Sequence, residues 1–483
     1  MKKIISTVLA PILILLAIAA LCSCARNSDS PPSEGEPAAP DYTLPAAQTE
    51  RPDADTRKRI EKRCREISEI YKDLFLTSQK KQSAANASSD LKRIEAPDKL
   101  AYQGRHERLQ QAAETFAQLS FGGERIAQSP NVGNGTLRLQ NQGTSGACYI
   151  TADSRQQITD ILLKNDITVL EPSDYNIDLL LGKDDFLSFW NDVSDGRDAE
   201  LETVAVSDSG GFYYQLFIRH GDETYYIFAD SAWTSCDGET VIEIKDITKT
   251  RISDWIYTEK GNFIYHCELP PSWATDGHRI IRIDTPDPEL TQYEKSYIGP
   301  IGYQSNNLFL TDWREDNLEK INFNDLYEYL YFLKTGNDPP VRSYSCDYDT
   351  FYRYIPPEEF EATIKTYFRI SSPLLKEIAS YDDDRGAYPW QEYTCSNVCP
   401  NPAMYPDVVG IEKHTDGTVT LTVDVVSPEM ETDRLFTHKT TVRPAEDGKF
   451  QYVSNKTIVY DENSMPIYYP RIKEQRSQKY QGY

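Results

Sequence analysis

The spacing of apolar residues predicts helices in the first part of the chain. From Thr56 to Lys81, apolar residues recur at intervals of four and three positions: Ile60, Cys64, Ile67, Tyr71 and Leu74. This spacing places them on one face of a helix whose other faces bear arginine and lysine. We interpret the basic face as solvated surface, with partner binding as the alternative. A second helical pattern covers residues 97–119, so we predict an N-terminal helical hairpin over residues 56–120.

Two shorter helical patterns precede a change to a period of two. One covers residues 154–164 and the other residues 183–193, where Phe186, Phe189 and Trp190 share a face. From Glu202 onward, alternating apolar positions predict strands at 211–219, 224–229, 240–245, 251–258, 262–268 and 279–284. The sequence from His220 to Glu223 is typical of a hairpin turn. We therefore predict a β-rich domain with an antiparallel sheet over residues 121–285.

The last part of the chain combines helices with a second set of strands. A helix at 324–334 lies in a predicted bridge over residues 286–340, and Pro339 and Pro340 end it. Another helix begins at Pro357 and continues past a break at Pro373. Strands follow at 408–413, 418–426, 435–443 and 450–459. This order predicts an α+β domain over residues 341–470, with a cone-like outline of the nuclear-transport-factor or cystatin kind, and a tail over 471–483.

The first residues have the pattern of an export signal. Lys2 and Lys3 precede an apolar run from Ile4 to Leu21, and the sequence then reads Leu21-Cys22-Ser23-Cys24. These four residues resemble a bacterial lipobox, so we predict a signal peptide over 1–23 and acyl chains, such as palmitate, on Cys24. A plain cleaved signal and a retained transmembrane helix are the alternatives. Residues 24–55 are rich in Pro, Ser, Ala and acids, which predicts a disordered tether.

The charge and the abundance of tyrosine narrow the classes of partner. The 483 residues have a formal net charge of −24, and loss of Lys2 and Lys3 with the signal would bring the chain to −26. Such a surface repels phosphate backbones, and the sequence has no glycine-rich phosphate loop, so we expect no nucleic-acid or nucleotide partner. The 32 tyrosines suit sheet faces or partly wet interfaces. The candidate ligand surface is the aromatic region with Tyr213, Tyr214, Tyr225, Tyr226, Trp233 and Trp255, and the concave face of the last domain is the second choice.

Motifs for catalysis and metal binding are weak. Cys395 and Cys399 could form half of a zinc site, but no second pair lies nearby, so we favour a local disulfide or two unrelated thiols and expect no metal or cofactor. The run from Asp382 to Asp384 lacks the ligand spacing of a calcium loop, and Asp384-Arg385-Gly386 is interpreted instead as a charged turn. Paired carboxylates for hydrolysis could exist, because their separation depends on the fold. Whether the chain is an enzyme stays open, with a non-enzyme favoured.

Several segments together are similar to a known family. They cover residues 255–267, 298–303, 307–313, 323–330, 388–390, 416–423 and 448–452, within about residues 200–458. In these segments the chain resembles an uncharacterised lipoprotein family of gut clostridia with a domain of unknown function. The resemblance implies a localisation and a domain extent, and it implies no catalytic residues.

These observations favour an extracytoplasmic binding or accessory module at the cell membrane, held by a lipid anchor. Its partners would be the membrane, through that anchor, and an envelope protein, peptide or glycan. One alternative is a carboxylate-dependent cell-envelope hydrolase, which requires a cavity with two inward acids of perturbed pKa. The other is a structural or assembly partner protein, which would show a large exposed apolar patch.

Overall fold

The computed structural model describes residues 50–88, 150–173, 177–236, 239–269, 277–393, 402–445, 448–460 and 465–472. Five predictions lie outside these residues: the signal, lipidation at Cys24, the tether up to residue 49, the second helix of the N-terminal hairpin, and the Cys395–Cys399 pair. Among the described helices, none combines the length and the apolar composition needed to cross a membrane.

Helix α2, Ala54–Ser88, confirms the first helical pattern and is longer than predicted. Ile60, Cys64, Ile67 and Tyr71 are buried, whereas Leu74 is half-buried and Phe75 continues the apolar face instead. The basic side of the helix is not uniformly solvated. Arg63 makes a bidentate ion pair with Glu202, with nitrogen–oxygen distances of 2.8–3.1 Å, and Arg59 pairs with Glu200. Part of the basic face therefore attaches α2 to a strand.

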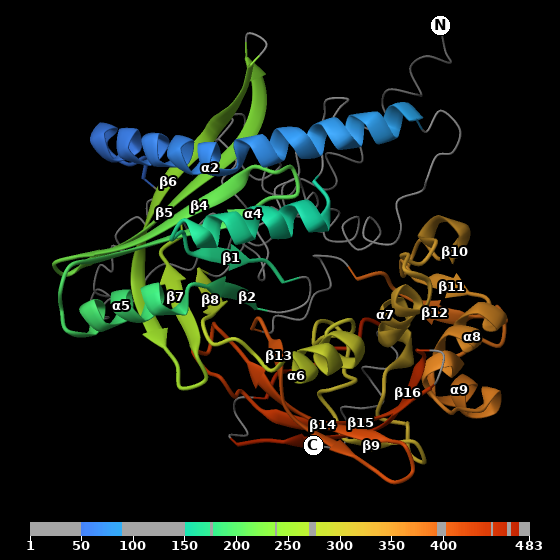
Figure 1. Ribbon diagram of the computed structural model, residues 1–483. Helices are drawn as coiled ribbons and strands as arrows, with labels where there is room; N and C mark the ends of the chain where they lie inside the picture. Colours follow the sequence, from blue (N-terminus) through green and yellow to red (C-terminus); the bar gives the residue numbers. More distant parts are fainter. Residues whose placement is uncertain are drawn as a thin grey trace, which may run out of the picture. The chain divides into compact units, whose positions relative to one another are not determined.

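The central region is a closed β-barrel with the strand order β1-β2-β8-β7-β6-β5-β4-β3 (Figure 1). The strands are β1 Val169–Glu171, β2 Asp178–Leu181, β3 Ala199–Val206, β4 Phe212–His220, β5 Glu223–Cys236, β6 Glu239–Tyr257, β7 Asn262–Cys267 and β8 His278–Arg282. Most neighbours are antiparallel, but β1 pairs with β3 and β2 pairs with β8 in parallel. These two parallel contacts insert the β1–β2 hairpin and close the sheet.

The predicted strands are confirmed, with corrections, and β3 was not among the predicted strands. The segments 240–245 and 251–258 are not separate strands but the two ends of β6, because buried Ile247 and Thr250 continue the strand between them. The short strands β1 and β2 were not predicted, because three or four residues are too few for periodicity to identify. Without them, the sequence indicated an antiparallel sheet, and the closure into a barrel was missed.

Aromatic rings and aliphatic side chains fill the barrel. One apolar cluster takes residues from all eight strands, among them Leu170, Leu180, Leu201, Phe217, Phe228, Ile252, Phe263 and Ile281. Helix α5, Lys183–Ser194, adds Phe186 and Phe189 to this cluster, and Phe186 lies 5.2 Å from Phe263 between ring centroids. An eight-stranded barrel is just wide enough for its own side chains, so this core is packed like an ordinary interior.

The outer face of the barrel is covered by helices. Helix α4, Ala152–Lys164, confirms the predicted helix at 154–164 and packs with α2 over β3, β4 and β5 (Figure 1). Along β4, Phe212, Tyr214 and Leu216 contact this layer, while the alternating residues Tyr213 and Phe217 point inward. The two-residue period of the strand therefore divides its aromatic residues between two cores.

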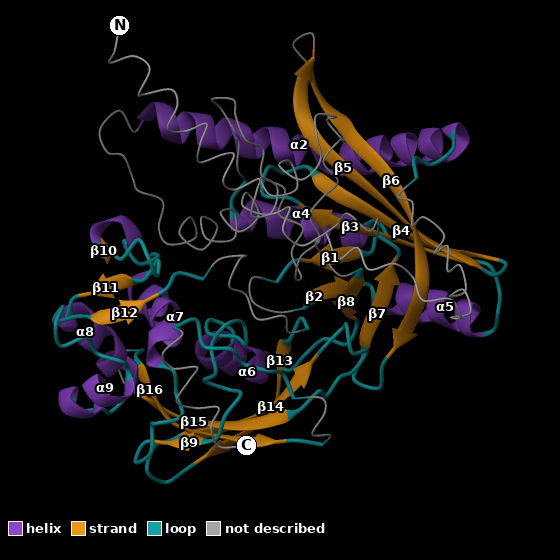
Figure 2. Ribbon diagram, turned by 180° about the vertical axis from the view of Figure 1, so that it is seen from behind, coloured by secondary structure: helices purple, strands orange, loops and turns teal. Residues whose placement is uncertain are grey.

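The rest of the chain forms a second α+β region around a five-stranded sheet with the order β13-β14-β15-β16-β9 (Figure 2). Its strands are β9 Trp313–Arg314, β13 Tyr405–Lys413, β14 Val419–Val426, β15 Thr437–Pro444 and β16 Phe450–Ile458. A three-stranded sheet contains β10 Ser345–Cys346, β11 Arg353–Ile355 and β12 Tyr388–Trp390. The helices are α6 Pro288–Tyr293, η1 Glu294–Ile298, α7 Phe323–Thr335, η2 Val341–Ser343, α8 Pro357–Tyr367 and α9 Ser372–Ile378.

One apolar core joins the predicted bridge to the predicted last domain. It includes Ile298, Leu326 and Trp313 from the bridge, and Phe360 and Leu421 from the domain. Strand β9 of the bridge pairs with β16, so the bridge supplies an edge of the main sheet. The mixed α+β class is confirmed. The exact domain boundaries and the cone-like outline stay predictions.

Candidate functional site

The six aromatic residues of the predicted ligand surface do not form one surface. Tyr213, Tyr226 and Trp255 belong to the cluster inside the barrel. Tyr214 and Trp233 lie on the outer face against the helical layer, where Trp233 stacks on Phe75 of α2 at 4.8 Å. Tyr225 also faces outward, with the Lys249 ammonium 3.6 Å above its ring. Strand alternation therefore separates neighbours in the sequence.

Three polar groups inside the barrel, Tyr226, Tyr265 and Cys267, are not activated for chemistry. Burial raises the pKa of Tyr226 and of Tyr265 well above the ordinary tyrosine value, so both hydroxyls stay neutral. Burial also raises the pKa of the Cys267 thiol to about 12. A buried thiol with a raised pKa is a poor nucleophile. The described barrel interior therefore has the properties of a structural core.

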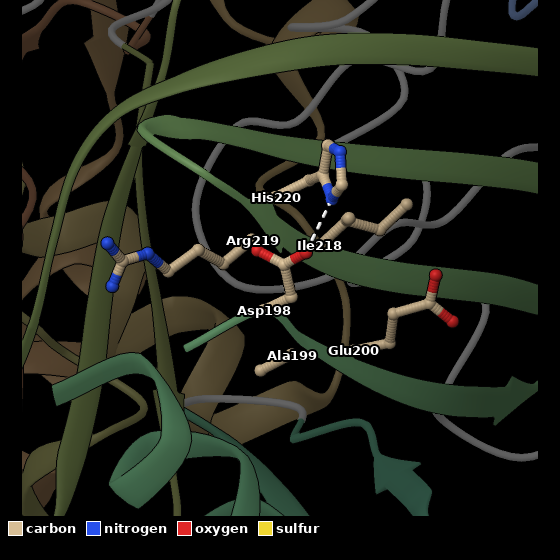
Figure 3. Close-up of a pocket in the computed structure, with 6 residues that line it drawn as sticks. All are labelled: Asp198, Ala199, Glu200, Ile218, Arg219 and His220. Carbon is tan, nitrogen blue, oxygen red and sulfur yellow. Dashed lines mark ion pairs between the residues drawn. The ribbon is translucent and has the colours of Figure 1, made fainter. Parts of the chain in front are cut away.

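A shallow depression of about 360 Å³ lies at the hairpin between β4 and β5 (Figure 3). Its lining residues are Asp198, Ala199, Glu200, Ile218, Arg219 and His220. His220 Nδ1 lies 2.7 Å from Asp198, and both side chains are more than half exposed. The Asp198 carboxylate also accepts a hydrogen bond from the Gly221 N–H, which lowers the pKa of Asp198.

The depression has limited chemical capacity. Its lining contains no Ser, Cys or Thr that could serve as a nucleophile beside His220. The Arg219 side chain points away from the His220–Asp198 pair (Figure 3) and donates to the carbonyl oxygen of Val193 at 2.6 Å. The contact between His220 and Asp198 therefore links the exposed β4–β5 turn to the residue that precedes β3.

Two carboxylates, Asp407 and Asp424, share a cation where the barrel meets the five-stranded sheet. The Lys260 ammonium contacts both Asp424 and Asp407, the latter at 3.3 Å, and Arg282 also pairs with Asp407 at 3.1 Å. Burial alone would raise the pKa of Asp424, but hydrogen bonds from Lys260, Thr437 and Arg434 lower it below the ordinary value. Glycoside hydrolysis needs one carboxyl with a raised pKa as general acid. Asp424 lacks this property, and its ion pairs indicate a structural contact.

A second ionic cluster is fully buried in the C-terminal region. Arg471 contacts Glu328 at 2.7 Å and Asp325 at 3.2 Å, and all three side chains are almost completely inaccessible. Burial raises the pKa of Asp325, although the charge of Arg471 and a hydrogen bond from Tyr468 oppose this effect. The cluster fastens the segment 465–472 to α7. These ion pairs account for the burial of the three charged side chains, so no catalytic role is needed to explain it.

The most exposed aromatic side chains lie on the loop between β10 and β11. Tyr348 is 83% exposed and Phe351 is 68% exposed, the highest values among the exposed large hydrophobic residues of the described chain. We call residues Asp347 to Phe351 the aromatic tip. Exposed aromatic residues of this kind are typical of binding surfaces, because they bring large contact areas at low cost in side-chain entropy.

Hydrogen bonds of Asp347 hold the aromatic tip in one conformation. Its carboxylate accepts from the Asp349 N–H at 2.9 Å and from the Arg385 guanidinium at 2.8 Å. These contacts, the backbone hydrogen bonds first, hold the pKa of Asp347 below its ordinary value. Arg385 also stacks over the ring of Tyr354 at 4.3 Å. The tip is thus supported by a neighbouring loop.

Phe351 adopts a backbone conformation that is unfavourable for an aromatic residue. Its φ angle is +61°, in the left-handed region that glycine and asparagine prefer. Its N–H donates to the Asp347 carbonyl oxygen at 2.8 Å, which closes the turn. A strained backbone that exposes a large aromatic side chain contributes little to folding, and such positions cluster at binding sites.

The sequence analysis did not select Tyr348 and Phe351. The exposure of a side chain cannot be inferred from a stretch of five residues. The available signal was two aromatic residues within an Asp- and Thr-rich turn, where an apolar side chain has no strand neighbour to cover it. The expected charged turn at Asp384-Arg385-Gly386 is confirmed, because these residues lie in a turn in which the Asp382 carboxylate accepts from the Arg385 N–H at 2.9 Å.

Three cysteines in the described part of the chain are free. Cys64 and Cys267 are buried and Cys346 is partly exposed. Cys346 precedes the aromatic tip directly, and its thiol lies 3.6 Å from the Asp347 carbonyl oxygen. No group of three or more metal-ligating side chains occurs among the described residues.

Fold and site together define a mixed α+β protein, built on a packed barrel and a five-stranded sheet, with a hydrogen-bonded aromatic tip at its surface. The chain belongs to the family of unknown function DUF6070, which matches residues 136–471. The match includes the barrel and the C-terminal region but not α2. No curated protein and no solved structure is similar to the chain.

Proposed function

We propose that this protein is a lipid-anchored, extracytoplasmic binding or accessory module of the bacterial cell envelope, related to the lipoproteins of gut clostridia that it resembles. The basic start, the apolar run and Cys24 after Ser23 support the anchor. The acidic surface supports a body that does not dock directly on anionic lipid. The residues between Cys24 and α2 would act as a tether.

The aromatic tip is the observation on which the binding role rests. Tyr348 and Phe351 are the most exposed large hydrophobic side chains described, yet Asp347 and Arg385 hold their backbone in place. A preorganised tip loses little conformational freedom when it binds a partner. A hydrolase has less support, because the paired carboxylates Asp407 and Asp424 are neutralised by Lys260 and Arg282.

Substitution of the lipidation residue tests the anchor. In cells labelled with an alkyne analogue of palmitate, Cys24→Ser should abolish labelling and release the protein from the membrane fraction or leave an unprocessed precursor. Cys22→Ser is the matched control and should leave labelling unchanged. Loss of labelling only in Cys22→Ser, or in neither variant, would contradict lipidation at Cys24.

Site-specific crosslinking tests the binding role. We would replace Tyr348 by p-benzoylphenylalanine in the full chain, irradiate intact cells and compare adducts with the same replacement at Tyr460, which is 58% exposed. We expect a discrete adduct at position 348 that disappears when Phe351→Ala is added. Equal adducts at both positions, or no adduct at 348, would argue against a binding role of the tip.

A further inference from the structure

We infer that the partner of the aromatic tip is a cationic polypeptide segment, with Lys or Arg side chains that contact the rings of Tyr348 and Phe351 and the carboxylates around them. The inference rests on the proposed binding role of the tip and adds the chemical class of the partner. Three features of the described residues support it: exposed rings, an excess of negative charge, and carboxylates without ion partners.

The rings provide the contact area. Tyr348 and Phe351 project from a short hairpin whose base is paired, with Cys346 opposite Arg353 in the register of β10 and β11. The face of an aromatic ring attracts ammonium and guanidinium groups within about 6 Å of its centre. The same contact already occurs beside the tip, where Arg385 lies over Tyr354. The tip therefore offers further rings to cations of a partner.

The charges near the tip favour cations over anions. Two adjoining loops contribute five carboxylates, Asp347, Asp349, Asp382, Asp383 and Asp384, against three cations, Arg353, Arg385 and the Lys376 ammonium over the ring of Tyr381. The two loops are joined by the ion pair between Arg385 and Asp347. This excess of negative charge repels anionic lipid head groups and nucleic acids and would steer a basic partner.

The carboxylates divide into structural and available groups. Asp347 and Asp382 bind Arg385 and backbone N–H groups. Asp349, Asp383 and Asp384 are exposed, and no ion pair within the described residues neutralises them. A neutral glycan could stack on the rings but would leave these three charges unused. A segment with lysine or arginine would use both the rings and the charges.

Peptide binding to the full chain, solubilised in a neutral detergent, tests this inference. The probe is a fluorescein-labelled (Lys-Ala)4 peptide, followed by fluorescence anisotropy at 150 mM salt. The matched probes are a (Glu-Ala)4 peptide, soluble peptidoglycan fragments and vesicles of phosphatidylglycerol. Because the whole chain is acidic, the specific signal is the difference between tip variants and surface controls.

We expect (Lys-Ala)4 to bind and the Glu peptide not to bind. Tyr348→Ala should weaken binding about tenfold, whereas the control Tyr460→Ala should not. The double change Asp383→Asn and Asp384→Asn should weaken binding about fivefold and reduce its salt dependence. Asp222→Asn, on the exposed turn between β4 and β5, is the matched charge control and should have no effect.

Two results would overturn the cationic partner. One is (Lys-Ala)4 binding that is absent or equal in the wild type and Tyr348→Ala. The other is tip-dependent binding of peptidoglycan fragments or vesicles without binding of the basic peptide. The second result would leave the proposed binding role intact and change only the class of partner. It therefore differs from the absence of a crosslink at position 348, which would contradict the binding role itself.

Discussion

The barrel and the C-terminal region both bury aromatic side chains, but the C-terminal region also exposes two of them at one loop. In the barrel, Phe217, Phe228 and Phe263 point into a closed interior and are almost completely buried. In the C-terminal region, Tyr348 and Phe351 point outward from a loop held by hydrogen bonds. The regions also differ in buried charge, because Arg471, Asp325 and Glu328 form an ionic cluster within the C-terminal region. An aromatic residue in this chain therefore belongs to a core in most places and is exposed at the tip.

The largest expected difference is between a buried and an exposed aromatic residue. Phe217→Ala should lower the free energy of unfolding by about 4 kcal/mol, because it removes a fully buried ring and leaves a cavity. Tyr348→Ala should change it by less than about 0.5 kcal/mol. Urea unfolding followed by circular dichroism would measure both. Similar losses of unfolding free energy in the two variants would contradict the distinction between buried and exposed aromatic residues.

The buried ionic cluster should be sensitive to loss of one partner. Arg471→Met should lower the free energy of unfolding by about 3 kcal/mol, because Asp325 and Glu328 would stay buried without a cation. Arg314→Met, which removes a largely exposed ion pair with Asp316, is the control and should cost less than about 0.5 kcal/mol. Denaturant unfolding of the two variants side by side provides the measurement. A neutral result for Arg471→Met would mean that the cluster does not hold segment 465–472 in place.

His438 should make the C-terminal region sensitive to acid. It is buried, with Nε2 2.9 Å from the Tyr303 hydroxyl and Nδ1 2.8 Å from the Thr440 hydroxyl, and burial lowers the pKa of His438 to about 3. In the unfolded chain the ordinary value is about 6.5, so below that pH the unfolded state binds more protons and stability falls.

This residue alone should remove about 2 kcal/mol of unfolding free energy between pH 7 and pH 5. Nitrogen-15 NMR of the His438 imidazole would show a neutral ring at pH 5. A protonated His438 at pH 5 in the folded protein would contradict this account. Loss of pH dependence in His438→Gln, measured as a difference from the wild type, would support it.

The smallest expected effects have opposite signs at two hairpin turns. Gly221, between β4 and β5, has a φ angle of +60° and no atom within 4 Å of an added Cβ, so Gly221→Ala should cost about 1 kcal/mol through backbone strain alone. Phe351→Asn places a tolerant residue at a similar φ angle and should stabilise by about 0.5 kcal/mol. Changes of the same sign in thermal unfolding would show that Phe351 is not strained.

The periodicity of apolar residues predicted individual helices and strands well, but it did not predict the contacts between them. The apolar stripe from Ile60 to Tyr71 and the helix α7 were predicted from the sequence alone. The ion pair between Arg63 and Glu202 was not, because the two residues are 139 positions apart. The predicted aromatic surface failed to assemble for a related reason. Tyr213 and Tyr214 are adjacent in the sequence, but the strand places them in different cores.

By itself, the sequence determined the local periods: helices at α2, α4, α5 and α7, strands β4 to β8 and β13 to β16, and glycine at the β4–β5 turn. These depend on which side chains share a face within a few residues. Only the tertiary structure decided that β1 and β2 close a barrel, that α5 fills it, and that Tyr348 and Phe351 stay outside every core. The closure of the barrel and the exposure of a side chain depend on contacts between segments that are distant in the sequence. A local pattern of residues does not predict the geometry of such contacts.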